Sequence, residues 1–229
     1  DFAFFRGCNL RCPYCYNREL VLEGETVNEG ANFSCAEEII FHLEKRRNVL
    51  KALTVSGGEA LLNPATEVIV KKAKSLGYKI KLDTNGTCPS LLEKFIKEPM
   101  LSPDYIAMDL KTSTKKLWKL AGHNEFDEKQ KEELNLQIEE KLRKSITMLS
   151  ALPPQKREWR TVLVPHLVNL EDISEMAQML PKDASWYFTS FAPQQCLDES
   201  YQRITPYNPL EEEKIILEAK KIIRGVEYR

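Results

Sequence analysis

Short runs of β-branched and aromatic residues alternate along the chain with longer segments of helical periodicity. The short runs predict strands at residues 2–6, 51–56, 78–83, 104–110, 159–164, 185–191 and 225–228. The longer segments predict helices at residues 34–47, 64–75, 89–97, 170–180 and 209–224. Ser34 and Glu37 suggest a capping box at the start of the first helix, and Gly77 is typical of a residue that closes the second.

The order of these elements predicts the fold class. Strands that alternate with helices pair in parallel through right-handed crossovers. Six or so such units in 229 residues predict an α/β fold of one domain, residues 1–229, built as an incomplete (β/α)6-type TIM barrel or an open sheet. In both architectures ligands bind at the carboxyl ends of the strands.

Residues 112–150 depart from this alternation, because they are long and rich in charge. An apolar face begins at Ile138 and continues through Leu142, Ile146 and Leu149. Residues 122–131 are polar. We therefore expect a surface excursion here, made of a solvated helix and a loop.

Composition and charge narrow the choice of partners. The chain has 33 Lys and Arg against 34 Asp and Glu, a net charge of −1, so neither nucleic acid nor an anionic membrane is expected as a partner. No apolar run approaches the length of about 18 residues that a membrane span needs. The chain opens at Asp1 without a Met or a recognisable signal peptide, so we expect the natural N-terminus to lie upstream and the protein to be cytoplasmic.

Three of the six cysteines, Cys8, Cys12 and Cys15, lie within eight residues, directly after the first predicted strand. Cysteines this close on one loop are typical of a metal site rather than of disulfides. A structural zinc site and an electron-transfer 4Fe–4S cluster both use four protein ligands. Three thiolates on a cubane would leave one iron open to another ligand. A zinc knuckle and three reduced core cysteines are the alternatives.

Glycines and charged residues follow the next three strands. Gly57 and Gly58 let the backbone approach a ligand closely, and Glu59 can bind polar groups. Asp83 and Asp109 end the following strands and could either cap helices or contact a ligand. A Lys two residues after an Asp, as in 109–111, suits a carboxylate or a ribose.

The cysteine spacing, with Tyr14 just before the last cysteine, resembles the radical S-adenosylmethionine (SAM) superfamily. The stretches GCNLRCPYCYNRELV, TVSGGEALLNP, GYKIKLDTNGTCP, DYIAMDLK and WRTVLVPHLV are similar to those of the activases of glycyl radical enzymes, above all the activating proteins of anaerobic ribonucleoside-triphosphate reductase. The similarity extends from Phe5 to about Leu197. It implies a 4Fe–4S cluster on Cys8, Cys12 and Cys15, and SAM as the second cofactor.

The same resemblance implies the ligand contacts. SAM would be bound by Tyr14, Ser56, Gly57, Gly58, Glu59, Asp83, Asn85, Asp109 and Lys111. A monovalent cation would lie among Asp83, Thr84 and Asp109. No catalytic side chain is expected beyond the cluster and SAM.

The activity implied is reductive cleavage of SAM to a 5′-deoxyadenosyl radical, which takes a hydrogen atom from a glycine of a partner enzyme. The expected partners are an anaerobic ribonucleotide reductase and a flavodoxin or ferredoxin-type electron donor. Two alternatives remain: a radical SAM enzyme for a small molecule or nucleoside, such as a deazaguanine synthase, and a non-catalytic metal-binding module.

Departures from the activase pattern limit the resemblance. Asn17 follows Tyr16 where many relatives have His-Asn, and the region of Ala192 lacks the His that some activases place against SAM. Cys35 is the one cysteine between the cysteine loop and Gly57, so no auxiliary cluster is expected. We read Cys35, Cys88 and Cys196 as ordinary thiols.

Overall fold

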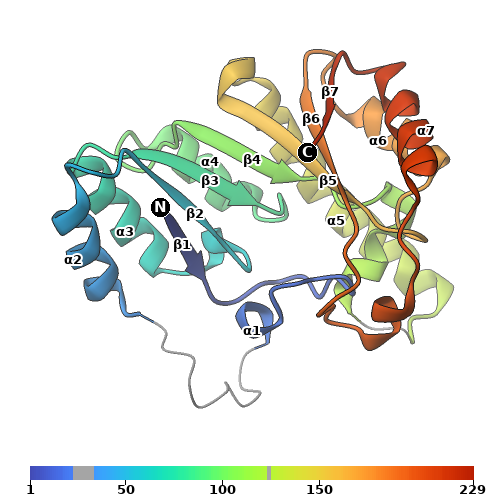
Figure 1. The fold of residues 1–229 in the computed structure, drawn as a ribbon, viewed down its shortest axis with the longest axis horizontal. Helices are drawn as coiled ribbons and strands as arrows, with labels where there is room; N and C mark the ends of the chain where they lie inside the picture. The colour runs from blue at the N-terminus through green and yellow to red at the C-terminus, as the bar shows by residue number, and fades with distance from the viewer. Residues whose placement is uncertain (23–33, 123–124) are drawn as a thin grey trace.

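The computed structural model describes residues 1–22, 34–122 and 125–229. In these ranges seven strands form a parallel sheet whose spatial order follows the sequence from β1 to β7 (Figure 1). The strands are β1 (Phe2–Phe5), β2 (Ala52–Gly57), β3 (Lys79–Thr84), β4 (Tyr105–Asp109), β5 (Arg157–Leu163), β6 (Ser185–Ser190) and β7 (Gly225–Tyr228). All seven predicted strands are therefore present, with ends that differ by at most two residues.

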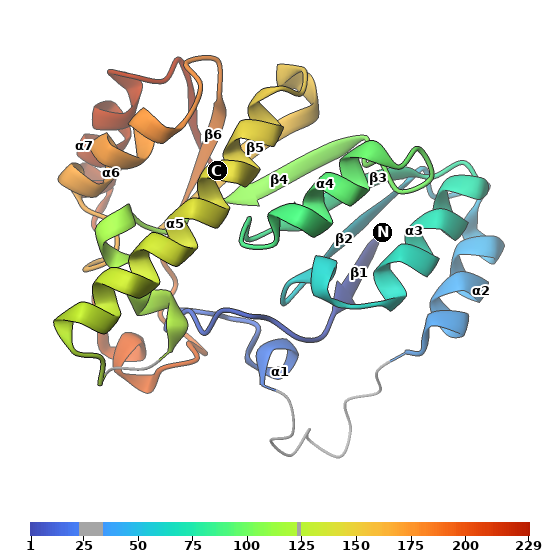
Figure 2. The same ribbon diagram turned by 180° about the vertical axis from the view of Figure 1, so that it is seen from behind.

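Helices cover the outer face of the sheet, as the front and back views show together (Figure 1, Figure 2). They are α2 (Ala36–Arg46), α3 (Ala65–Ser75), α4 (Pro89–Lys97), α5 (Glu128–Ser150), α6 (Leu170–Met179) and α7 (Pro209–Lys220). The short helix α1 (Arg18–Val21) lies instead beyond the end of β1 (Figure 1). Short 3-10 helices add Ala60–Leu62, Thr114–Ala121, Pro154–Lys156 and Glu199–Arg203. Within the ranges described, none of the helices has the length and apolar character needed to cross a membrane.

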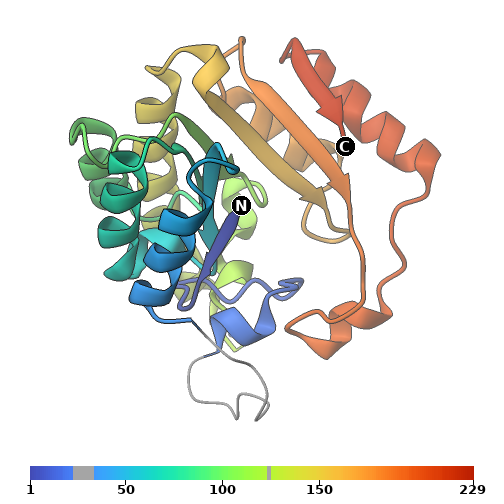
Figure 3. The same cartoon turned by 60° about the vertical axis from the view of Figure 1, so that its left-hand side comes forward.

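The sheet curves but does not close. Strand β1 pairs with β2 at one end and β7 pairs with β6 at the other, and the two end strands are not paired with each other. Figure 3 shows β1 and β7 at the two ends of the curved sheet. The incomplete barrel predicted from the sequence is confirmed, with seven strands.

Alternation along each strand separates the core from the inward face. Side chains of a strand point alternately to its two faces, and in β5 Trp159 is fully buried whereas Arg160 is partly exposed. Likewise Ile80 and Leu82 of β3 are buried, and Asp83 is not. Apolar residues thus pack beneath the helices, and charged residues line the inside of the barrel.

The start of α2 differs from the sequence prediction. The helix begins at Ala36 with Cys35, rather than Ser34, as its N-cap. The backbone N–H of Cys35 donates to the carboxylate of Glu38 at 3.0 Å, so the capping box lies one residue later than predicted. Gly77 has φ of 89° after α3, the left-handed conformation expected of a residue that closes a helix.

Residues 112–150 form the connection between β4 and β5. The predicted apolar face of α5 is confirmed, since Ile138, Leu142, Ile146 and Leu149 are buried. Ser145 on the same face donates its hydroxyl to the carbonyl of Gly86 at 2.7 Å. One side of α5 therefore belongs to the core and supports the end of β3, and its other side carries charged residues.

Candidate functional site

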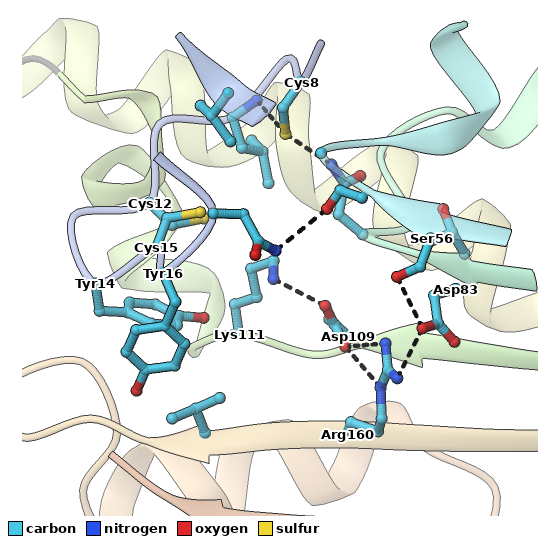
Figure 4. A pocket seen from close by; sticks show the side chains of 18 residues that line it. Cys8, Cys12, Tyr14, Cys15, Tyr16, Ser56, Asp83, Asp109, Lys111 and Arg160 are labelled. Carbon is cyan, nitrogen blue, oxygen red and sulfur yellow. Dashed lines mark hydrogen bonds and ion pairs between the residues drawn. The ribbon is translucent and has the colours of Figure 1, made fainter. Parts of the chain in front are cut away.

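A cavity of about 240 Å³ lies at the carboxyl ends of the strands (Figure 4). It is lined by Cys8, Leu10, Cys12, Tyr14, Cys15, Tyr16, Asn17, Val21, Ser56, Gly57, Gly58, Asp83, Thr84, Asn85, Asp109, Lys111, Arg160 and Val162. Every residue predicted for the site is among them except Glu59. The strand-end motifs of β2, β3 and β4 therefore meet the cysteine loop at one place.

Backbone contacts hold the cysteine loop against β2. The N–H of Cys15 donates to the carbonyl of Cys12 at 3.0 Å, which folds the loop back on itself. The N–H of Glu59 donates to the carbonyl of Gly7 at 2.8 Å. A Cβ at Gly58 would lie 2.2 Å from that carbonyl oxygen and 3.2 Å from the Cβ of Cys8. Glycine is therefore required where β2 meets the loop.

The three loop thiols suit a cluster better than a single ion. They are free, and all three line the cavity. In the part of the chain described, no three His, Cys, Asp or Glu side chains are grouped to hold one metal ion. A 4Fe–4S cluster bonds each thiolate through a different iron, so thiolates spread around a cavity fit it.

Cluster binding must displace protons. Burial raises the pKa of the Cys12 thiol to about 12, although the ammonium of Lys111 acts in the opposite direction. Burial also raises the pKa of Cys8. The thiols of Cys8 and Cys12 are therefore protonated before metal binding, so their ligation is favoured by higher pH.

Asn85 connects the end of β3 to the cysteine loop. Its side-chain amide donates to the sulfur of Cys8 at 3.8 Å and to Asn9 Oδ1 at 3.1 Å. The backbone N–H of Thr87 donates to Asn85 Oδ1 at 2.9 Å and fixes the amide's orientation. Hydrogen bonds to a ligating sulfur tune the reduction potential of a cluster, so Asn85 is placed to affect the electronics of the site.

Two carboxylates and two cations form the opposite wall of the cavity. Lys111 Nζ lies 3.0 Å from Asp109 Oδ2, and the guanidinium of Arg160 pairs with both Asp109 and Asp83. Ser56 donates its hydroxyl to Asp83 Oδ2 at 3.0 Å. Burial alone would raise the pKa of Asp109, but Lys111 and Arg160 outweigh it and lower that pKa below its ordinary value. Asp109 is therefore ionised at neutral pH.

Glu59 was predicted to bind SAM, and the structure places it elsewhere. It is 1% exposed and does not line the cavity. Its carboxylate accepts hydrogen bonds from the backbone N–H of Asn85 at 2.6 Å, the hydroxyl of Thr84 at 2.9 Å and the N–H of Leu61 at 3.4 Å. Through these contacts Glu59 positions the turn after β3.

The buried carboxyl of Glu59 predicts a pH-dependent stability. Burial raises its pKa to about 7 despite its three hydrogen bonds. Because the folded state favours the protonated carboxyl, its contribution to stability is complete at pH values below the ordinary pKa of a Glu. That contribution is lost as the pH rises through about 7. We expect the unfolding free energy of the wild type, relative to Glu59→Gln, to fall by on the order of 3 kcal/mol between pH 4.5 and pH 8. Anaerobic urea unfolding at several pH values measures this difference, and parallel pH profiles for the two proteins would contradict it.

The resemblance to the activases predicted a monovalent cation among Asp83, Thr84 and Asp109. Thr84 turns its hydroxyl to Glu59, and the N–H of Gly86 donates to the same oxygen at 3.1 Å. Both carboxylates are paired with the guanidinium of Arg160. A side-chain cation therefore lies at the place that the resemblance assigned to an ion.

Arg160 was missed by the sequence analysis, as were Val162, Tyr16 and Asn17. Alternation in β5 offered a signal, since Arg160 and Val162 flank a buried Thr161 and so share the inward face. Tyr16 ties the cysteine loop to the segment after β6, because its hydroxyl accepts from the N–H of Ala192 at 2.9 Å. The sequence carries no local signal for that contact.

The remaining cysteines do not line the cavity. Cys35 is exposed at the start of α2, and Cys88 is partly buried at the start of α4. Cys196 is buried, and its thiol donates to the carbonyl of Pro193 at 3.3 Å. The arrangement leaves three cysteines for a cluster.

Comparison with known proteins identifies the class. Residues 2–180 match the model of the radical SAM superfamily, so the chain belongs to this superfamily. The fold agrees: the crystal structure of Streptococcus suis SuiB bound to S-adenosylmethionine superposes with a TM-score of 0.59 at 14% identity, over all of this chain and 49% of that one. The protein is a radical-generating enzyme whose cofactors are a 4Fe–4S cluster and SAM.

Two relatives of this chain carry names that describe different activities. A Methanocaldococcus jannaschii protein, provisionally named a glycyl-radical enzyme activating enzyme, is 31% identical over 226 residues, which cover 96% of this chain and 83% of that protein. The 7-carboxy-7-deazaguanine synthase of Aquifex aeolicus is 26% identical over 184 residues, which cover 80% of this chain and 75% of that enzyme. Both relatives agree with the superfamily, and their names assign them different reactions.

Proposed function

We propose that this protein activates a glycyl radical enzyme by removing a hydrogen atom from a glycine Cα of that partner. The partner we favour is an anaerobic ribonucleotide reductase, with a flavodoxin or ferredoxin-type protein as the electron donor. The observation that carries the proposal is the similarity to the M. jannaschii activating enzyme along nearly the whole of both chains.

The cavity offers each part of SAM a suitable neighbour. Cys8, Cys12 and Cys15 would hold the 4Fe–4S cluster, which would supply the electron for the reductive cleavage of SAM. The backbone at Gly57 and Gly58 lines the cavity beside the cysteine loop, and the absence of side chains there leaves room for the methionine end. Lys111 and Asp109 provide a charged donor and an acceptor for carboxylate and ribose groups.

Apolar side chains protect the reacting region from water. Tyr14 is 5% exposed and lines the cavity, with Leu10 beside it on the same loop and Val162 on β5. The ammonium of Lys111 lies 6.0 Å from the ring centre of Tyr14, so the charged wall and the apolar wall meet there. Exclusion of water protects a radical from side reactions.

The open barrel supports a macromolecular substrate. Strands β1 and β7 end the sheet without pairing to each other, and the cavity lies at the same end as the segment that follows β6 (Figure 3). A glycine held in a loop of another protein must approach SAM closely, which a sealed pocket would prevent. A glycyl radical is stabilised by its flanking amides, so hydrogen transfer from glycine to the 5′ carbon is favourable.

A second candidate is a radical SAM enzyme that acts on a small purine-like molecule. The similarity to the A. aeolicus deazaguanine synthase favours it, because three quarters of that enzyme is matched. The identity is lower than with the activating enzyme, and so is the coverage of both chains.

Electron paramagnetic resonance distinguishes the two candidates. Anaerobic incubation of the reduced protein with SAM and the reductase is expected to produce a glycyl doublet on the reductase. A Gly→Ala variant at the radical site of the reductase is the control and should give no doublet. SAM cleavage without a doublet on any glycyl radical enzyme of the same source, together with conversion of a purine-like molecule, would favour the second candidate.

A further inference from the structure

Arg160 of β5 connects the ends of β3 and β4 through one guanidinium. Its Nη1 lies 3.2 Å from Asp83 Oδ2 on β3, and its Nε and Nη2 each lie 2.9 Å from Asp109 Oδ1 on β4. Figure 4 shows the guanidinium between the two carboxylates, at the wall of the cavity. Removal of this group would leave two carboxylates of adjacent strands near each other without their shared counter-ion.

The charges around this bridge balance without an added ion. Asp83 and Asp109 contribute two negative charges, and Arg160 and Lys111 contribute two positive ones. Lys81 also faces Asp83, at 3.7 Å from its Oδ1, but lies nearer to Glu158, at 3.3 Å. A further cation at the two carboxylates would therefore meet two side-chain cations already in place.

We propose that Arg160 is a built-in counter-ion that holds Asp83 and Asp109 in position for SAM, so that SAM binding needs no monovalent cation from solution. Arg160 is then a positioning residue. The inference rests on SAM binding in this cavity and holds whichever substrate the radical attacks.

A guanidinium suits this role better than a dissolved ion. It is always charged, and its planar fork reaches two carboxylates at once through separate N–H groups. Its covalent attachment to β5 keeps it at the site at every salt concentration. Asp109 and Arg160 are direct partners in the register of β4 and β5, so the sheet itself sets their distance.

SAM affinity in different salts tests the inference. The affinity of the anaerobic, cluster-loaded protein for SAM is measured by isothermal titration calorimetry. It is compared between potassium chloride and N-methylglucamine chloride at equal ionic strength. The wild type is expected to bind SAM equally in both salts. In the organic salt, Arg160→Gln is expected to bind SAM at least about tenfold more weakly than the wild type, because the charge-assisted contact of the guanidinium with the carboxylates is lost. In potassium chloride its SAM affinity should recover several-fold. Arg160→Lys should need less potassium than Arg160→Gln.

Two further variants give the test its controls. Arg143→Gln, on the exposed side of α5, should behave as the wild type in both salts. Asp83→Asn combined with Arg160→Gln removes one carboxylate and should abolish the recovery in potassium. A purely structural role would lower the thermal stability of Arg160→Gln without any potassium-dependent recovery of SAM affinity, and that result overturns the inference. If Arg160→Gln does not fold, the wild type alone still tests the proposal. Equal SAM affinity in the two salts supports it, and a tenfold loss of affinity without potassium contradicts it.

Discussion

Replacing Cys8, Cys12 or Cys15 by serine is expected to abolish both the iron–sulfur absorbance and all SAM cleavage. Each of the three lines the cavity, and no other cysteine does. A serine hydroxyl does not ionise as a thiol does, so a cluster with three protein ligands would lose one of them. The measurements are the visible absorbance, the iron and sulfide content, and 5′-deoxyadenosine formed after reduction under anaerobic conditions.

The other three cysteines provide matched controls. Cys35→Ser, Cys88→Ser and Cys196→Ser should keep about four irons and four sulfides per chain and should cleave SAM. Loss of the cluster in Cys196→Ser would contradict the three-ligand account. One zinc per chain in anaerobically purified protein, with no iron, would favour a metal-binding module instead.

Lys111→Ala is expected to weaken SAM binding by about 1.5–3 kcal/mol, a loss of roughly 10- to 150-fold in affinity. Lys111 lines the cavity and pairs with Asp109 at 3.0 Å. Burial opposes its charge, but Asp109 and the other acidic groups around it raise its pKa well above the ordinary value. The side chain is therefore charged at every working pH, and its removal deletes a charged donor.

SAM titration of the cluster-loaded variant measures this loss. Lys144→Ala is the control, because Lys144 pairs with Glu140 on the exposed side of α5. Its SAM affinity should equal that of the wild type. An unchanged affinity in Lys111→Ala, with the cluster intact, would reject the placement of SAM beside Asp109.

The elements of the fold could be predicted because their signals are local. Apolar runs bounded by polar residues marked all seven strands, and the spacing of Cys8, Cys12 and Cys15 lies within one loop. Parallel pairing then brings strand ends to one edge, which is why Gly58, Asp83 and other strand-end residues were predicted to meet.

The rest depends on contacts between segments far apart in the chain. Glu59 lies next to Gly58 in sequence, yet the local turn directs its side chain to Thr84 and away from the cavity. The role of Arg160 follows from the register of β5 against β4, which brings it to Asp109, a residue 51 positions earlier in the chain. Periodicity can place Arg160 on a face of its strand, but it cannot determine which carboxylates of neighbouring strands it meets.

Transfer of deuterium from the partner's glycine tests the central claim most directly. The reductase is prepared with glycine deuterated at the α-carbon and incubated anaerobically with the reduced protein and unlabelled SAM. If this protein is a glycyl radical activase, the 5′-deoxyadenosine formed gains one deuterium, and the glycyl doublet appears in step with it. Formation of 5′-deoxyadenosine that carries no deuterium, with no doublet on the reductase, would contradict the account.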